Sequence, residues 1–491
     1  MSGCRSRTVV AGLVFLGMTC LALADVSAAE ADDETLILIE EDEPGQQASG
    51  DEAEMLIIES DEDAAPDAPV IVGGDDALPA ADDSRAAGSG AGGPALRLDR
   101  ARIEYAPLID GGHDVDAIGL AQAELSLGWN PGERWEARIA ARVDGFLQSG
   151  TPSADRVDLD YGETWLRYRG EGLSLTLGAQ KVIWGRIDEI PPTDRLSTQD
   201  FTRFILDALP ERRRARPMLR IEHFSELGKL DVMLMPTFRG AELPEKDSIW
   251  YPIDRRRGEI IGIPADPLLR QVVRAAAIDD DAPSDDDGIG LRFSRSQGAL
   301  DMAVTVQHGR QSAPYYEYQP LRNTLRARYP HASSLGADLG IEAAGVLWRF
   351  EAAWVSDVPV TRRLGYRYDT VEAISWAAGV EFYPGDGDAR INLQLAAMQL
   401  RDAGDVLDRD RIYNFNGSME VPFAENRWRA SMRFFSGLDK HDVYLNPRIT
   451  FVGWEPHSLY AELHWFDGSN GTLGGFHQDH ALIALGWRAA F

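Results

Sequence analysis

The stretch that decides the fold is the closing one, Ala481–Phe491, with the sequence ALIALGWRAAF. Successive side chains of a strand point to opposite faces. Ile483, Leu485 and Phe491 therefore share an apolar face, and Arg488 lies on the other face among small residues. One face suits lipid and the other a polar lumen, which is typical of a strand of a transmembrane β-barrel.

The same alternation recurs upstream of the closing strand. In each segment one face is apolar and the other carries the charges. Trp129, Trp135 and Trp465 lie near expected strand ends, where outward aromatic residues form the interfacial girdles of such barrels. The clearest apolar sets lie within Leu459–Trp465, Trp428–Phe434, Val346–Trp354, Leu300–Val306 and Trp135–Val143.

The connections between these segments fall into two classes that alternate along the chain. Tight turns are expected at 130–133, 169–172, 226–229, 296–298, 343–345, 384–387, 423–426 and 453–456. Mostly longer polar segments are expected at 148–156, 182–214, 239–286, 310–333, 357–370 and 468–479. A soluble β-sandwich has the same local alternation but not this pattern of connection lengths. We therefore predict an all-β, antiparallel transmembrane barrel of about 18 strands over residues 95–491.

Residues 1–29 have the layout of a cleaved secretory signal. Arg5 and Arg7 precede the apolar run Val9–Ala24, and small residues follow the run. The mature chain is expected to begin near Glu30. Both cysteines of the protein lie in the signal, so disulfides and cysteine-ligated metals are not expected.

Residues 30–94 form an acidic tail, with twenty acidic residues against the single basic residue Arg85. Such a composition cannot bury enough apolar surface to fold, so we predict a disordered tail on the periplasmic side. A β-prone apolar run followed by acids recurs at Leu36–Asp42, Met55–Asp61 and Val70–Asp76. These runs are either drifted low-complexity sequence or short motifs that add as strands to a periplasmic protein.

The segment 182–214 is the most distinctive connection. Pro191 and Pro192 end strand geometry, and Ser197–Asp200 resembles a helix start, which predicts a short amphipathic helix over Asp200–Leu209. We expect a folded insertion that lies in or over the barrel mouth and forms the constriction. The candidate constriction residues are Trp184, Gly185, Arg186, Asp188, Pro192, Asp194 and Arg195.

One motif in this region carries a family resemblance. The run Leu177-Gly178-x-Gln180-x-Val182-x-Trp184-Gly185-Arg186, followed by Pro192-x-Asp194, resembles the hallmark of a proteobacterial outer-membrane barrel family of undefined function. That family is related in architecture to the alginate-export porins. Pro191 stands where the family more often has Asn. The resemblance implies a porin-like fold with a structured loop and no particular substrate. The terminal Phe491 also resembles the signal that the barrel assembly machinery recognises.

Arginines on the inward faces are the candidate lumen residues. They either form ladders with the inward carboxylates to balance charge, or they attract anionic solutes. The sequence leaves both interpretations open. The set is Arg138, Arg142, Arg167, Arg427, Arg429, Arg433, Arg448 and Arg488.

These features predict a porin-like channel for the passive transport of small or oligomeric polar solutes, with anionic solutes among the candidates, across the outer membrane. The long loops are expected to be extracellular, and membrane lipid and the barrel assembly machinery are the expected partners. The alternative is an accessory export or docking barrel that recruits a periplasmic protein through its tail. The nine histidines form no strong catalytic or metal template. We expect no enzyme activity, cofactor, metal or nucleic-acid partner.

Overall fold

The computed structural model describes residues 92–109, 114–284, 286–385 and 387–491. The expected signal 1–29 and the acidic tail as far as residue 91 lie outside the described residues. The barrel begins at Gly92, three residues before the expected boundary. No described helix is long and apolar enough to cross a membrane.

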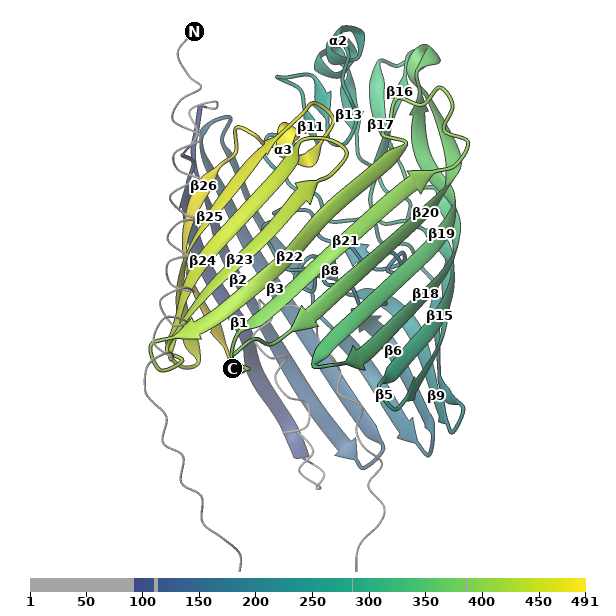
Figure 1. Ribbon diagram of the computed structural model, residues 1–491, viewed down its shortest axis with the longest axis vertical. Helices are drawn as coiled ribbons and strands as arrows, with labels where there is room; N and C mark the ends of the chain where they lie inside the picture. The colour runs from purple at the N-terminus through teal and green to yellow at the C-terminus, as the bar shows by residue number, and fades with distance from the viewer. Residues whose placement is uncertain (1–91, 110–113, 285, 386) are drawn as a thin grey trace, which may run out of the picture. The chain divides into compact units, whose positions relative to one another are not determined.

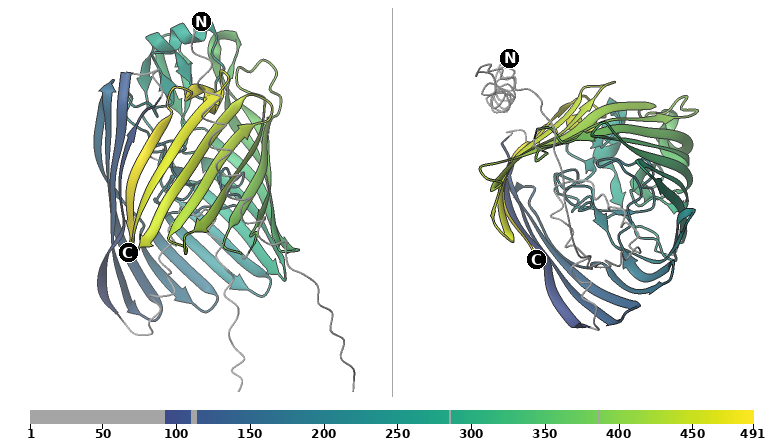
Figure 2. Two further views of the ribbon diagram at one scale, coloured as in Figure 1. Left: turned by 60° about the vertical axis from the view of Figure 1, so that its left-hand side comes forward. Right: turned by 60° about the horizontal axis from the view of Figure 1, so that its bottom comes forward.

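The main sheet is a closed antiparallel barrel of 18 strands (Figures 1 and 2), as the alternation and the turns predicted. Each strand pairs with the next along the chain, and β1 pairs with β26 to close the ring. β4 and β5 together form one interrupted strand beside β3. The strands are β1 (Gly92–Pro107), β2 (Asp114–Gly132), β3 (Trp135–Thr151), β4 (Ala154–Tyr161), β5 (Thr164–Gly170), β6 (Leu173–Gln180), β9 (Arg216–Ser225), β10 (Gly228–Met235), β14 (Gly288–Gln297), β15 (Leu300–Arg310), β18 (His331–Ala343), β19 (Val346–Arg362), β20 (Arg367–Phe382), β21 (Arg390–Leu400), β22 (Arg411–Phe423), β23 (Trp428–Gly437), β24 (Asp442–Trp454), β25 (His457–Gly468) and β26 (Leu482–Ala490).

Strand β15 shows why the sequence forms a barrel. Met302, Val304 and Val306 are exposed on the outside, whereas Thr305 and Gln307 are buried on the inside. An exposed apolar face on a closed sheet is stable where lipid covers it. The same division holds at β26, where Leu485 and Phe491 are exposed and Arg488 is buried.

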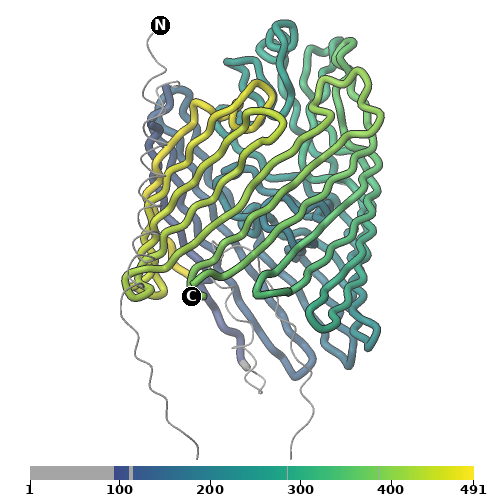
Figure 3. The backbone as a smooth tube through the Cα atoms, in the orientation of Figure 1, coloured from purple at the N-terminus to yellow at the C-terminus, as the bar shows by residue number. Residues whose placement is uncertain are grey.

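All eight expected tight turns connect neighbouring strands, and we call this side the turn end of the barrel (Figure 3). Two expected loops are shorter than predicted, because the strands continue into them. Only residues 152–153 separate β3 from β4, and residues 363–366, which include the 3₁₀ turn η2 (Leu364–Tyr366), separate β19 from β20.

At the opposite, loop end the connections β10–β14 and β15–β18 fold together into a small cap. It contains α2 (Pro267–Ala275), the pair β11 (Ile253–Asp254) and β12 (Glu259–Ile260), and a sheet of β13 (Ala277–Asp279), β17 (Thr324–Arg328) and β16 (Tyr315–Gln319). Its apolar core includes Tyr251, Val273 and Leu325. The sequence predicted polar loops here.

Hydrogen bonds stabilise the cap in addition to its apolar contacts. The hydroxyls of Tyr251 and Tyr316 both donate to Asp280, at 2.7 and 3.0 Å. Burial raises the pKa of both tyrosines, so they remain protonated donors. Arg257 also donates to the carbonyls of Phe476 and Gly475, which belong to the short helix α3 (Leu473–Phe476) and join the cap to the last loop.

The closing seam depends on an inward tyrosine. Tyr460 of β25 donates to Glu104 at 2.6 Å and accepts from Nε of Arg102 at 2.8 Å, both on β1. Its ring lies over Gly486 of β26, where an added Cβ would lie 2.1 Å from the ring. A glycine is therefore required at this position for β26 to fit between β25 and β1.

Gly486→Ala is expected to destabilise the barrel by about 1–3 kcal/mol, the usual cost of overpacking. Unfolding in urea, followed by the change in gel mobility of the refolded barrel, measures this effect. Gly128→Ala on β2 is the matched control, since a Cβ there meets nothing within 4 Å. Equal midpoints for the two variants would refute the role of Gly486.

Candidate functional site

The connection between β6 and β9, residues 181–215, folds back into the barrel, and we call it the inserted loop. Its residues bond to inward side chains on many strands. The partners are Glu104 of β1, Arg142 of β3, Asp231 of β10, Gln307 of β15, Asp338 of β18, Glu351 of β19, Ser375 of β20, Asn392 of β21 and Arg433 of β23. Figure 2 shows chain segments inside the ring of strands. The inserted loop therefore crosses the bore.

The first anchor of the inserted loop is the buried carboxylate of Glu351. It accepts from the backbone N–H groups of Arg186 and Thr193, at 2.9 and 2.6 Å, and from the Thr193 hydroxyl at 2.7 Å. Gly185 has φ of 130°, and a Cβ there would lie 2.9 Å from both carboxylate oxygens. Only glycine lets the backbone approach the carboxylate this closely.

Further expected constriction residues bond to the wall on either side of Glu351. Arg186 donates from Nε to Asp338 at 2.6 Å, and Asp338 also pairs with Arg292 of β14. Asp188 pairs with Arg349 of β19 at 3.1 Å. Trp184 donates to Asp231 at 3.3 Å, and its ring packs against Gly290 of β14.

The remaining expected residues bond mainly within the inserted loop, and Arg195 also donates to Ser375 of β20 at 3.3 Å. Asp194 accepts from Nε and Nη2 of Arg213, at 2.9 and 2.8 Å, and from Ser197 at 2.7 Å. Arg195 donates to the carbonyl of Pro192 at 2.7 Å. The pair β7 (Thr198–Gln199) and β8 (Arg213–Arg214) closes the base of this part. The loop is thus a folded element with its own internal bonds.

The expected helix over Asp200–Leu209 is wrong, because this stretch forms a series of turns. Asp200 does accept from the N–H of Thr202, at 3.1 Å, but the chain then turns through Phe204 with φ of 54°. Arg203 bonds to Glu104 at 2.6 Å, and Asp207 accepts from Arg102 at 2.8 Å. These contacts with β1 replace the regular bonds of a helix.

Seven of the eight expected lumen arginines pair with carboxylates. Arg427 instead lies over the ring of Phe451, 5.6 Å from its centroid. Arg448 and Arg488 meet around Tyr460, together with Arg102. The pairs are Arg138–Asp99 (2.8 Å), Arg142–Asp144 (2.7 Å), Arg167–Glu136 (3.4 Å), Arg429–Glu420 (3.2 Å), Arg433–Glu189 (3.2 Å), Arg448–Glu462 (2.8 Å) and Arg488–Glu211 (3.7 Å).

Four functional residues were not predicted from the sequence: Arg102 and Glu104 of β1, and Asp231 and Asp338 of the wall. The signal for the first two was present, because Arg100, Arg102 and Glu104 alternate with apolar residues in β1. The roles of the two aspartates follow from their contacts, since Asp231 bonds to Trp184 and Arg220, and Asp338 bonds to Arg186 and Arg292.

No family model matches the chain, and none of the curated proteins compared with it matches. Solved structures of similar fold include OccAB1 of Acinetobacter baumannii, at 10% identity and a TM-score of 0.49, covering 82% of this chain and 98% of that one. OpdL of Pseudomonas aeruginosa has 12% identity and a TM-score of 0.44, covering 81% and 98%. Wzi of Escherichia coli, described as a carbohydrate-binding β-barrel, has 13% identity and a TM-score of 0.42, covering 80% and 85%. The family resemblance of the loop motif stays a prediction.

Glu351→Ala is expected to release the inserted loop, because several backbone and hydroxyl donors lose a charged acceptor, each bond contributing roughly 1.5–3 kcal/mol. Trypsin should then cleave at Arg186 and Arg195 at least tenfold faster than in the unchanged barrel. The cleavage rate of Glu351→Gln, which keeps an acceptor oxygen, should lie between those of Glu351→Ala and the unchanged barrel. Glu425→Ala, at an exposed turn, is the control. Unchanged cleavage of Glu351→Ala would show that Glu351 does not hold the loop.

Proposed function

We propose that the chain is a porin-like channel of the outer membrane that lets small polar solutes pass by diffusion, with the inserted loop as its constriction. The observation that carries this proposal is the bonding of the loop backbone to the buried carboxylate of Glu351. A loop bound in this way narrows the bore from inside. The apolar outer faces of the strands support a place in lipid.

The pairing of the wall arginines supports charge balance as their role. A guanidinium group that already contacts a carboxylate contributes little net field to the bore. We propose that the wall has weak overall charge selectivity and that the inserted loop decides which solutes pass. Of the two interpretations that the sequence left open, this proposal favours charge balance over the attraction of anionic solutes.

Replacing residues 184–212 with a short Gly-Ser linker is expected to raise the single-channel conductance at least twofold, because the loop no longer occupies the bore. Planar-bilayer recording in KCl measures it. Shortening the β16–β17 turn at residues 320–323, in the cap, should leave the current unchanged. An unchanged current after the loop replacement would remove the loop from the conducting path.

In a tenfold KCl gradient, the reversal potential of the unchanged channel is expected to lie within a few millivolts of zero, because the wall arginines are paired. Arg429→Gln, whose pair with Glu420 is half exposed, should move it slightly toward cation preference. A strongly anion-selective potential would contradict the paired-wall interpretation and favour the anion-attracting one.

A further inference from the structure

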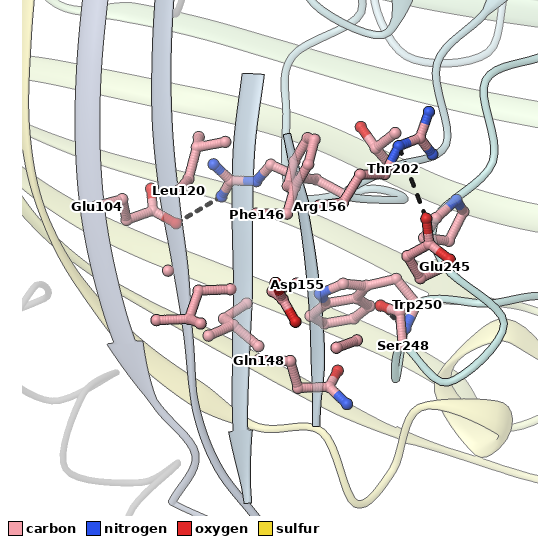
Figure 4. Close-up of a pocket in the computed structure, with 16 residues that line it drawn as sticks. Glu104, Leu120, Phe146, Gln148, Asp155, Arg156, Thr202, Glu245, Ser248 and Trp250 are labelled. Carbon is pink, nitrogen blue, oxygen red and sulfur yellow. Dashed lines mark hydrogen bonds and ion pairs between the residues drawn. The ribbon is translucent and has the colours of Figure 1, made fainter. Parts of the chain in front are cut away.

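The closing seam of the barrel is incomplete at the turn end. Toward the loop end, β1 has a strand on each side, with β2 on one and β26 on the other from Arg100 to Tyr105. Its inner face is covered there as well, since Glu104 accepts from Arg203 of the inserted loop at 2.6 Å (Figure 4). Toward the turn end, residues 92–98 still pair with β2, but no described strand pairs with their other side. We call this side of residues 92–98 the open edge.

The open edge presents backbone hydrogen-bonding groups. In Figures 1 and 2 the beginning of β1 runs past the C-terminus of the chain. The last backbone contact of the seam is the N–H of Phe491, which donates to the carbonyl of Asp99 at 3.4 Å. Alternate residues of an antiparallel strand direct their N–H and C=O groups to opposite sides. About half of the backbone groups of residues 92–98 therefore face the open edge, although Pro94 has no N–H to donate.

Most of the open edge lies on the lipid side of the turn-end aromatic residues. Trp129 of β2 is 48% exposed on the outside, and Ala95 pairs with Gly128, one residue farther from the turn. Leu96 is 74% exposed and pairs with the outward Leu127. Backbone groups that face lipid find no water to bond, so an unpaired strand edge is costly at this depth. A strand that covers residues 95–98 removes this cost.

One segment of the chain itself has a suitable composition. The run Val70–Asp76, which lies outside the described residues, reads Val-Ile-Val-Gly-Gly-Asp-Asp. Val and Ile are enriched in strands because their branched side chains pack well on a pleated surface. The two glycines separate this apolar part from the acids. The run can therefore place its apolar part against lipid and its acids in water.

The register between the run and β1 follows from the alternation of side chains. If Val72 lies opposite Leu96 in an antiparallel pair, Val70 lies opposite Leu98. Both valines then join the outward apolar face. The acids lie opposite residues 92 and 93, closer to the turn end than Trp129 and outside the lipid. A shift of one residue would turn the valines inward, so the outward face fixes the register.

The connection between the run and β1 is short. It consists of the fifteen residues 77–91, which are rich in Ala, Gly and Ser. Neighbouring strands lie about 5 Å apart, so this connection easily reaches back, and the tether holds the run at a high effective concentration beside the open edge. The runs Leu36–Asp42 and Met55–Asp61 need longer connections, and each doubling of a loop lowers its closed population roughly threefold. The nearest run is therefore favoured.

We infer that Val70–Asp76 adds to the open edge of β1 as an antiparallel strand and completes the closing seam at the turn end. Backbone hydrogen bonds supply the affinity of such strand addition, and alternate side chains supply its specificity. The acidic tail thus has a binding surface on the barrel itself. The inference concerns the wall and not the bore, so it does not depend on the proposed channel function.

Two other occupants fit the open edge less well. A second copy in the same membrane has the same orientation, so its β1 would run parallel, and parallel pairing is slightly less stable per residue. A strand of a separate periplasmic protein has no tether and must supply the whole cost of association. The tethered run has the advantage over both.

The test is disulfide formation in the full-length protein in outer-membrane vesicles, with Cys4→Ser and Cys20→Ser so that only introduced cysteines are present. Val72→Cys with Leu96→Cys is expected to form a disulfide within one chain, because opposite residues of antiparallel strands lie about 5 Å apart. Val72→Cys with Leu127→Cys is the matched control, since Leu127 shares the outward face with Leu96 but lies one strand farther away. Mass spectrometry of the non-reduced tryptic digest should find the first bridge at least tenfold more often.

Each other outcome of the cross-linking counts against the inference. Equal bridging to positions 96 and 127, or bridging to neither, would show that the run does not lie beside β1. Disulfides between two chains would assign the open edge to a second copy. Ile58→Cys with Leu96→Cys tests the next run, and more frequent bridging there would overturn the choice of Val70–Asp76.

Hydrogen exchange measures the same pairing without cysteines. Ile71→Pro removes one N–H and disrupts strand pairing in the run, so the amides of residues 95–98 that face the open edge should exchange at least tenfold faster. Ile57→Pro makes the same change in the run Met55–Asp61 and should leave this exchange unchanged. Both substitutions lie outside the barrel, and the gel mobility of each variant confirms that the barrel has folded. Equal exchange of residues 95–98 in the two variants would refute the pairing.

Discussion

The interaction on which the interior depends is the contact between the Glu351 carboxylate and the backbone N–H groups of the inserted loop. A loop inside a barrel leaves the solvent and must find partners for its peptide groups. A carboxylate on the wall accepts several of them at once, and Gly185 lets the backbone come close enough. The bonds of Arg186, Asp188 and Thr193 to neighbouring strands then follow from this fixed point.

The second constraint is the cost of charge inside the barrel. Ions removed from water are stable only when they are paired and hydrogen-bonded. The wall meets this condition by placing a carboxylate beside nearly every inward arginine that the sequence suggested, and the loop takes part, since Glu189 meets Arg433 and Glu211 meets Arg488. The loop and the wall thus form one network of charges, so a change in the loop alters the charge balance of the wall.

How much of the structure the sequence could predict depends on how far apart in the sequence the interacting residues lie. The strands and all eight tight turns were predictable, because lipid exposure and turn chemistry act within a few residues. The predicted helix over Asp200–Leu209 was wrong, because Arg203 bonds to Glu104, about a hundred positions away in the sequence. The cap was missed because its core joins Tyr251, Leu325 and Leu407 from three different connections. Its helix α2 had a local signal, the N-cap Asp266 followed by Pro267, and could have been predicted.

The same reasoning explains why the inserted loop, unlike the wall, places neighbouring residues in different surroundings. Wall side chains repeat around a closed ring, and their charges are bound to partners on the wall or in the inserted loop. The inserted loop has no such periodicity, so it can place Arg203 and Phe204, adjacent in sequence, against different cavities. The left-handed backbone at Phe204, with φ of 54°, accompanies this change of direction. A local backbone feature of one loop therefore lets two adjacent residues line different cavities.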